Sequence, residues 1–171
     1  TRMKEVLTKD IVQRKLKSIR ISQMIWGTYF INVRLVEVGR LQYEYVDMHT
    51  IRIHIPSDEK LEVLKVIDSI ASSKNVIKQY FKVEKPQYVC DSWLLSPEIH
   101  QLVSKDSNIY QFYELFNVSK GYDCIRDIFD FVYRTKECDY RELAEETSLQ
   151  RVIKEYLLDG NCIYLGCGIL K

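Results

Sequence analysis

The stretch Tyr88-Val-Cys90-Asp-Ser92-Trp93-Leu-Leu-Ser-Pro97 decides most of what can be inferred about the fold. An apolar run ends here in a thiol, a carboxylate, a hydroxyl and an indole, and a Ser-Pro turn follows. Buried strands of α/β folds end in this way where the carboxyl edge of the sheet lines a ligand crevice. We therefore interpret residues 87–90 as a buried strand and the polar residues after it as the wall of a candidate pocket.

Two half-buried strands are indicated upstream, because apolar and polar residues alternate over 39–45 and again over 50–55. Pro56 ends the second strand, since it has no amide hydrogen for a ladder. The period then becomes helical from residue 61 and is expected to continue to Phe81; the proposed apolar face consists of Leu61, Leu64, Ile67, Ile70 and Ala71. Strand, helix and strand in this order predict a right-handed crossover between parallel strands. The strand ends at 54–56 and 90–93 are then expected to be neighbours in space.

The rest of the chain predicts further short elements. We expect a helix over 98–103, a strand over 110–118 and a helix over 122–134. A capping box, Thr147-Ser-Leu-Gln150, starts another helix, Gly160 ends it, and residues 162–170 form a last strand. The predicted fold class is α/β, with a mixed, mostly antiparallel sheet, one parallel β-α-β crossover and flanking helices.

Charge is distributed unevenly along the 171 residues, although the net charge is only +1. Residues 1–20 contain seven basic and two acidic residues, and residues 10–21 have the pattern of an amphipathic helix. This basic segment is interpreted either as a solvated helix face or as an entrance that attracts anions. The near-neutral total argues against a nucleic-acid partner, and no apolar run approaches the ~20 residues that would span a membrane.

Five cysteines occur, and none forms a C-x-x-C pair. Because no secretory signal precedes them, we expect reduced thiols in a cytoplasmic protein. No ligand spacing indicates a zinc site or another metal site.

Several motifs in a fixed order resemble the GNAT-like carboxyl-terminal domain of a family of bacterial acyltransferases. They cover roughly residues 25–170 and comprise residues 38–44 (VGRLQYE), 53–58 (IHIPSD), 90–97 (CDSWLLSP), 107–109 with Phe112 and Phe116, and 147–151 (TSLQR). In that family a helical amino-terminal domain precedes the GNAT-like domain. The resemblance therefore implies that residues 1–24 are the remnant of such a domain, which would be a partner, and that residues 25–171 form the GNAT-like domain.

The resemblance also implies a cofactor. Acyl-coenzyme A, such as acetyl-CoA, lies in the family's fold between the two parallel strands, with its pyrophosphate on backbone amides before the intervening helix. The matching residues here are Pro56, Ser57, Asp58 and Lys60. This segment departs from the usual glycine-rich loop, because it has no glycine and carries two carboxylates, a poor combination for binding phosphate.

The candidate catalytic residues are His54, as a general base, and Cys90, as a nucleophile or a thioester contact. The candidate substrate contacts are Ser92, Trp93, Asn108 and Arg151. Each also has a structural reading: a packed histidine, a buried strand thiol, a tight turn with an indole on the core, a turn before a strand, and an arginine paired with Glu145 or Glu146.

Three functions follow from these residues. The first is transfer of an acyl group from coenzyme A to an amine or hydroxyl of a small-molecule substrate. The second is a catalytically inactive GNAT-like module that binds a ligand or a partner. The third, least favoured by the sequence, is a cysteine hydrolase that would use Cys90 and His54.

Overall fold

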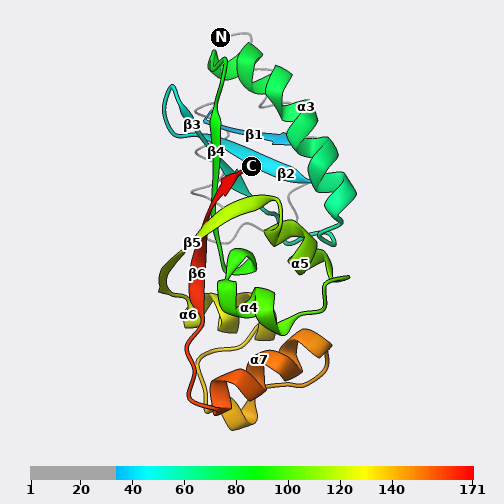
Figure 1. Cartoon of the computed structure of the whole chain (residues 1–171), viewed down its shortest axis with the longest axis vertical. Helices are drawn as coiled ribbons and strands as arrows, with labels where there is room; N and C mark the ends of the chain where they lie inside the picture. The colour runs from blue at the N-terminus through cyan, green and yellow to red at the C-terminus, as the bar shows by residue number, and fades with distance from the viewer. Residues whose placement is uncertain (1–33) are drawn as a thin grey trace. The chain divides into compact units, whose positions relative to one another are not determined.

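The computed structural model describes residues 34–171, so the expected helix over 10–21 and the segment 1–24 lie outside the described residues. The chain forms two compact units. The first unit comprises the described residues up to Lys60 together with Leu64–Tyr88, and the second comprises Leu61–Val63 and Val89–Lys171. Figure 1 labels the strands and the α-helices of both units.

The first unit contains the start of the sheet and one long helix. Strands β1 (Leu35–Val38), β2 (Leu41–Tyr45) and β3 (Thr50–His54) pair in antiparallel order. Helix α3 (Val63–Phe81) follows, and strand β4 (Gln87–Ser92) begins beside β3, where the Gln87 amide donates to the carbonyl oxygen of His49 at 2.7 Å. The predicted alternation is confirmed: Leu41, Tyr43, Ile51 and Ile53 are buried.

The buried face of α3 is not the one predicted. Of the five residues expected on it, only Ile70 is buried, whereas Leu64 is 73% exposed and Ile67 is 45% exposed. The residues that the helix does bury are Val66, Ser69, Ile70, Ser73 and Ile77, which recur at helical spacing. The prediction of the buried face from apolar residues alone was wrong because two of the buried positions are occupied by serines.

Both serines are buried because tyrosines of the sheet satisfy their hydroxyl groups. The Ser69 Oγ donates to the Val38 carbonyl oxygen and lies 2.8 Å from the Tyr43 hydroxyl. The Ser73 Oγ donates to the Ile70 carbonyl oxygen and lies 3.0 Å from the Tyr88 hydroxyl. Burial raises the pKa of Tyr43 to about 12, which keeps its hydroxyl neutral at ordinary pH. These contacts attach α3 to strands β1, β2 and β4.

The second unit is built on three antiparallel strands and short helices. Strand β6 (Tyr164–Leu170) pairs with β4 on one side and with β5 (Phe116–Asp123) on the other. The remaining elements are η1 (Trp93–Leu95), α4 (Pro97–Leu102), α5 (Asn108–Tyr113), α6 (Ile125–Asp127), η2 (Ile128–Tyr133), η3 (Tyr140–Glu142) and α7 (Ser148–Leu158). The strand order is β1-β2-β3-β4-β6-β5, which confirms the predicted mixed, mostly antiparallel α/β sheet.

Residues 88–97 turn sharply after β4 because the last strand contains glycine. Gly166 pairs with Ser92, and a Cβ on Gly166 would lie 1.7 Å from the Leu95 carbonyl oxygen. Turn η1 can therefore lie directly against β6 only where the side chain is absent. The Ser92 side chain caps this turn by accepting from the Leu94 amide.

One predicted strand was wrong in part. Residues 110–118 were expected to be extended, but α5 occupies the first half and β5 begins only at Phe116. The Ser107 side chain accepts from the Tyr110 amide and starts the helix, and the Phe112 ring packs 5.1 Å from that of Phe116. A cap and a buried aromatic pair thus outweighed the strand propensity of the segment. The capping box at Thr147 and Gln150 is confirmed.

We predict that Ser69→Ala destabilises the protein more than Tyr43→Phe. The alanine leaves the Val38 carbonyl oxygen and the Tyr43 hydroxyl without Ser69, at a cost of about 1–3 kcal/mol, whereas the phenylalanine removes one hydrogen bond, worth about 1 kcal/mol. Urea unfolding would measure the difference in free energy of unfolding. Ser72→Ala, at an exposed position of the same helix, is the control. An equal or larger cost for Tyr43→Phe would contradict the prediction.

Candidate functional site

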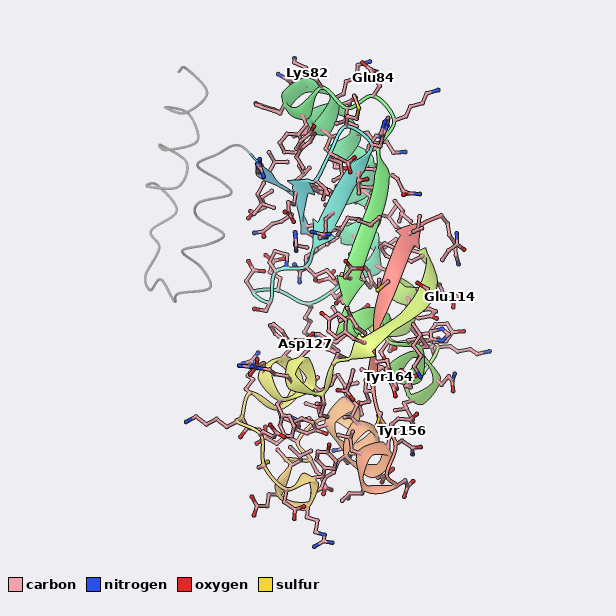
Figure 2. The ribbon with its side chains drawn as sticks, turned by 90° about the vertical axis from the view of Figure 1, so that its left-hand side faces the viewer. Lys82, Glu84, Glu114, Asp127, Tyr156 and Tyr164 are labelled. Carbon is pink, nitrogen blue, oxygen red and sulfur yellow. The ribbon has the colours of Figure 1, made fainter. Side chains whose placement is uncertain are left out.

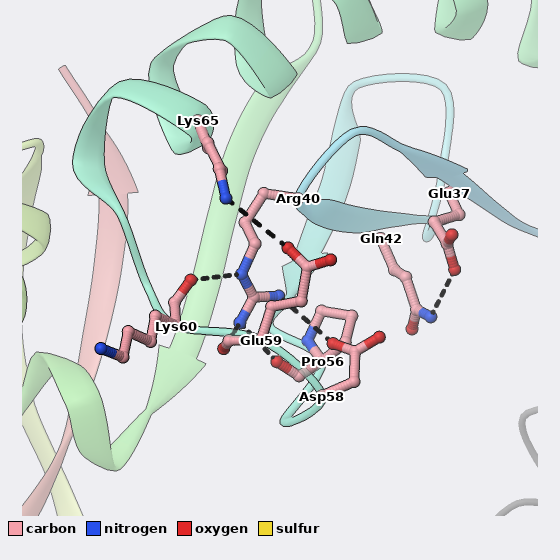
Figure 3. Close-up of polar contacts among 8 residues, drawn as sticks. All are labelled: Glu37, Arg40, Gln42, Pro56, Asp58, Glu59, Lys60 and Lys65. Carbon is pink, nitrogen blue, oxygen red and sulfur yellow. Dashed lines mark hydrogen bonds and ion pairs between the residues drawn. The ribbon is translucent and has the colours of Figure 1, made fainter.

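The loop between β3 and α3 is organised around the buried side chain of Arg40, which is 3% exposed. The Arg40 Nη2 donates to the carbonyl oxygens of Pro56 and Glu59, both at 2.7 Å, and the Nε donates to that of Lys60 at 3.1 Å. The Asp58 carboxylate lies 3.8 Å from the Nη1 atom. Figure 3 shows the guanidinium group enclosed by this loop. The four predicted cofactor residues, Pro56, Ser57, Asp58 and Lys60, therefore all lie in this loop.

A tight turn between β1 and β2 delivers Arg40 to this position. Gly39 occupies the first turn position with φ of 57°, a conformation that glycine adopts without strain, and Arg40 follows it. A Cβ on Gly39 would lie 3.4 Å from the Cβ of Ser69 in α3. Ser69 also binds the preceding Val38 carbonyl oxygen. The turn is therefore held against the same helix whose first residues follow the loop.

A pocket of about 550 Å³ lies beside the turn between β1 and β2. All of its lining residues belong to the first unit. Four carboxylates line it, against two cationic side chains: Glu37, Asp58, Glu59 and Asp68, with Arg40 and Lys65. Lys65 lies 3.9 Å from Glu59, and Arg40 is occupied by the loop carbonyls. The side chains of the pocket therefore disfavour a phosphate, so anion binding at this loop would depend on backbone amides.

The predicted base His54 lies at the end of β3 with a carboxylate partner that the sequence did not reveal. Its Nε2 lies 2.8 Å from Glu44 Oε2, and Arg52 Nη1 lies 3.5 Å from the same oxygen. All three side chains alternate with the buried Tyr43 and Ile53, so they extend from the sheet face opposite those residues. An ionised carboxylate only accepts hydrogen bonds, so His54 Nε2 is the donor to Glu44 in this pair.

Cys90 belongs to the second unit, in β4 opposite Gly168, and is 0% exposed. Ser92 caps turn η1, and Trp93 is half-buried against the core of this unit. These positions match the structural readings of all three residues. Their functional roles stay predictions.

The other two candidate substrate contacts lie on different helices of the second unit. Asn108 is the first residue of α5 and is exposed. Arg151 is exposed in the first turn of α7, where its Nη1 donates to the Glu145 carbonyl oxygen at 2.9 Å. Among residues 89–171 no hydrogen bond joins Asn108 or Arg151 to Ser92 or Trp93. Figure 2 shows the side chains of this unit, with Tyr164 and Glu114 labelled.

Sequence reasoning missed two residues of the site, Arg40 and Glu44. A weak signal for Glu44 was available, because it alternates outward on β2 while His54 does so on β3. Arg40 follows a glycine at the end of a strand, but no local pattern shows that an arginine there folds inward. In the described residues, no group of three or more histidine, cysteine or acidic side chains is placed to hold a metal ion. No helix of residues 34–171 is long and apolar enough to cross a membrane.

Residues 35–170 match the family of the GNAT-like C-terminal domain, a range that includes every element described above. The chain belongs to this family. The GNAT-like C-terminal domain is thus confirmed by a match over most of the chain and not by short motifs alone. No curated protein matches the sequence.

Solved structures with the same fold as this GNAT-like C-terminal domain are acyltransferases. One, in complex with decanoyl-CoA, has a TM-score of 0.76 and 25% sequence identity; the match covers 85% of this chain and 48% of that one. A mutant acyltransferase in complex with octanoyl-CoA has a TM-score of 0.75 and 22% identity, with 85% and 49% covered. An acyltransferase with CoA and 10C-teicoplanin gives the same values. The GNAT-like chain spans about half the length of these proteins.

The positions of the five cysteines generate a labelling prediction. Cys162 is exposed and Cys90 is fully buried, so iodoacetamide is expected to alkylate Cys162 first and Cys90 much later. Mass spectrometry of peptides from a labelling time course would measure the order. Cys162→Ser is the control that removes the fast site. Fastest labelling at Cys90 would contradict the prediction and would favour the cysteine hydrolase.

Proposed function

We propose that this protein is an acyltransferase that moves an acyl group from acyl-coenzyme A to an amine or hydroxyl of a small-molecule acceptor. The observation that carries the proposal is the His54–Glu44 pair at the end of β3, directly before the loop that Arg40 organises. Membership of the GNAT-like family and the acyl-CoA bound to acyltransferases of the same fold support it. Decanoyl-CoA and octanoyl-CoA are the ligands bound to those other proteins. The length of the acyl group that this protein would transfer is therefore left to experiment.

In this proposal His54 is the general base. Its Nδ1 would take the proton from the acceptor amine or hydroxyl as that group attacks the thioester carbonyl, and the thiolate of coenzyme A would leave. Glu44 would hold the imidazole in the tautomer with a basic Nδ1 and stabilise the imidazolium that forms. This is the orienting carboxylate that a histidine base commonly requires.

The segment of Pro56, Ser57, Asp58 and Lys60 would bind the pyrophosphate of the cofactor, mainly through the backbone amides that follow Pro56, which has no N–H of its own. The helix α3 that follows is 19 residues long, and its dipole favours an anion at this end. We retain Cys90 as a proposed thioester contact and Ser92, Trp93, Asn108 and Arg151 as proposed substrate contacts. The helical domain that precedes the family's GNAT-like domain is a proposed partner of this one.

A catalytically inactive binding module is the alternative, and one observation favours it. The loop has no glycine and exposes two carboxylates, Asp58 and Glu59, where an anion would bind. Such a module would keep the fold and bind another ligand or a partner domain. Failure of CoA and acetyl-CoA to bind in calorimetric titration would contradict the proposed acyltransferase activity and would favour the binding module.

We infer a bacterial cytoplasmic setting for either function. The motifs of this chain resemble those of a bacterial family. None of the cysteines in the described residues forms a disulfide. Reduced thiols are typical of the cytoplasm.

The role of His54 is tested by His54→Gln. Loss of the base is expected to lower kcat by about 100-fold or more, with little change in the affinity for coenzyme A. Glu44→Gln, which keeps the shape but weakens the orienting bond, is expected to lower kcat by a smaller factor. Release of the CoA thiol from acetyl-CoA or decanoyl-CoA, measured with a panel of amine and hydroxyl acceptors, would report the rate.

His49→Gln and Glu142→Gln are matched controls at exposed positions. Both should turn over at the wild-type rate. A His54→Gln variant that is as active as the wild type would remove His54 as the base.

The charge of the loop generates a second prediction for the same function. Asp58 is 76% exposed, so Asp58→Asn is expected to tighten CoA binding about two- to fivefold by removing like-charge repulsion with the phosphates. The gain should shrink as salt increases from 20 mM to about 0.5 M, because exposed charges are screened. Calorimetry at both salt concentrations would measure it, with Asp159→Asn in the second unit as the control. Weaker binding by Asp58→Asn would contradict the proposed position of the phosphates.

A further inference from the structure

The partners of the Arg40 guanidinium are mainly backbone carbonyls. A buried guanidinium must be hydrogen-bonded, since an unpaired buried charge costs several kcal/mol. Three carbonyl oxygens of the loop meet this requirement at 2.7, 2.7 and 3.1 Å. The Asp58 carboxylate contributes less, because it is farther away and 76% exposed. The main effect of Arg40 is therefore on the path of the backbone.

Peptide geometry then determines where the loop amides point. None of the described peptide bonds is cis, and in a planar trans peptide the C=O of one residue and the N–H of the next point in opposite directions. The Pro56 and Glu59 carbonyls point toward Arg40, so the Ser57 and Lys60 N–H groups point away from it. Within residues 34–171 neither amide donates a hydrogen bond to a protein acceptor. Both residues are exposed, so these donors are open to a ligand.

We propose that Arg40 is a positioning residue for the cofactor: by holding the carbonyls of Pro56 and Glu59 inward, it turns the Ser57 and Lys60 amides outward to bind the pyrophosphate of coenzyme A. This inference rests on the proposed function. It explains how a loop without glycine can present backbone donors to phosphate. A glycine-rich loop brings its backbone close to the phosphate because side chains are absent, whereas this loop is given its shape from the inside by an arginine.

Only an arginine satisfies this geometry. Its Nε and Nη2 atoms donate in different directions from one rigid plane and so reach three carbonyls at once. The ammonium group of lysine would carry the same charge but would donate all its hydrogen bonds from a single atom. Arg40→Lys therefore keeps the charge and loses the shape of the loop, while Arg40→Gln loses both.

The test compares coenzyme A with pantetheine, which has the same thiol arm but no pyrophosphate. Calorimetry on the full chain should show that Arg40→Lys raises the Kd for CoA about tenfold, the equivalent of one hydrogen bond to a charged group. The Kd for pantetheine should change less than twofold. In turnover assays of Arg40→Lys, kcat/KM for acyl-CoA should fall because KM rises. The kcat for acyl-pantetheine should not change. Arg40→Gln should show the same pattern with a larger loss.

The controls separate this role from a structural one. Arg126→Lys, at an exposed position of the second unit, should bind both compounds as the wild type does. Equal losses for CoA and pantetheine in Arg40→Lys, or no loss for CoA, would overturn the inference while leaving the proposed function intact. If the wild type binds pantetheine as tightly as CoA, or binds neither, the proposed pyrophosphate site fails and this inference with it.

A second measurement needs no variant, in case the Arg40 variants do not fold. Hydrogen–deuterium exchange of the wild type with and without CoA should show protection at the Ser57 and Lys60 amides. Protection of other amides by bound CoA, with these two unchanged, would overturn the inference. Pantetheine, at a concentration that saturates its site, should leave the exchange of both amides unaltered.

Discussion

Burial of the Arg40 guanidinium is the constraint on which the candidate site depends. Three backbone carbonyls must lie within hydrogen-bond distance of it, so the path of residues 56–60 follows from the position of one side chain. A loop of this composition would otherwise have many conformations, since it contains a serine and three charged residues and no secondary structure. The arginine replaces that freedom with one shape, and the shape orients both the carbonyls and the amides.

The position of Arg40 depends in turn on how α3 packs against the strands. Ser69 binds Val38 and Tyr43 at once, and Gly39 leaves room for the turn beside the helix. Interior polar groups of this kind stabilise a structure only when every partner is present. Ser69 therefore contributes to the site as well as to the fold, because it holds the turn that places Arg40 under the loop.

Local patterns predicted most of the elements, and they failed where contacts between distant residues decide. The strands around Tyr43 and Ile53 and the capping box at Thr147 follow from alternation and from side-chain hydrogen bonds within a few residues. The face of α3 did not follow, because Ser69 is buried through a tyrosine 26 residues away. The pair of His54 and Glu44 shows the same limit. The strand pattern of the sequence places each residue on its own strand, but the contact between them depends on the register of the two strands.

The sequence by itself determined the family, the α/β fold class and the identity of His54 and the loop after it as candidates, because these properties are encoded in motifs and in short-range periodicity. Only the tertiary structure decided that Glu44 lies within hydrogen-bond distance of His54 and that Arg40 folds inward to bind the loop carbonyls. The physical reason is that a buried charge or hydroxyl takes its position from the partner that satisfies it. That partner is chosen by packing and strand register, which adjacent residues do not specify.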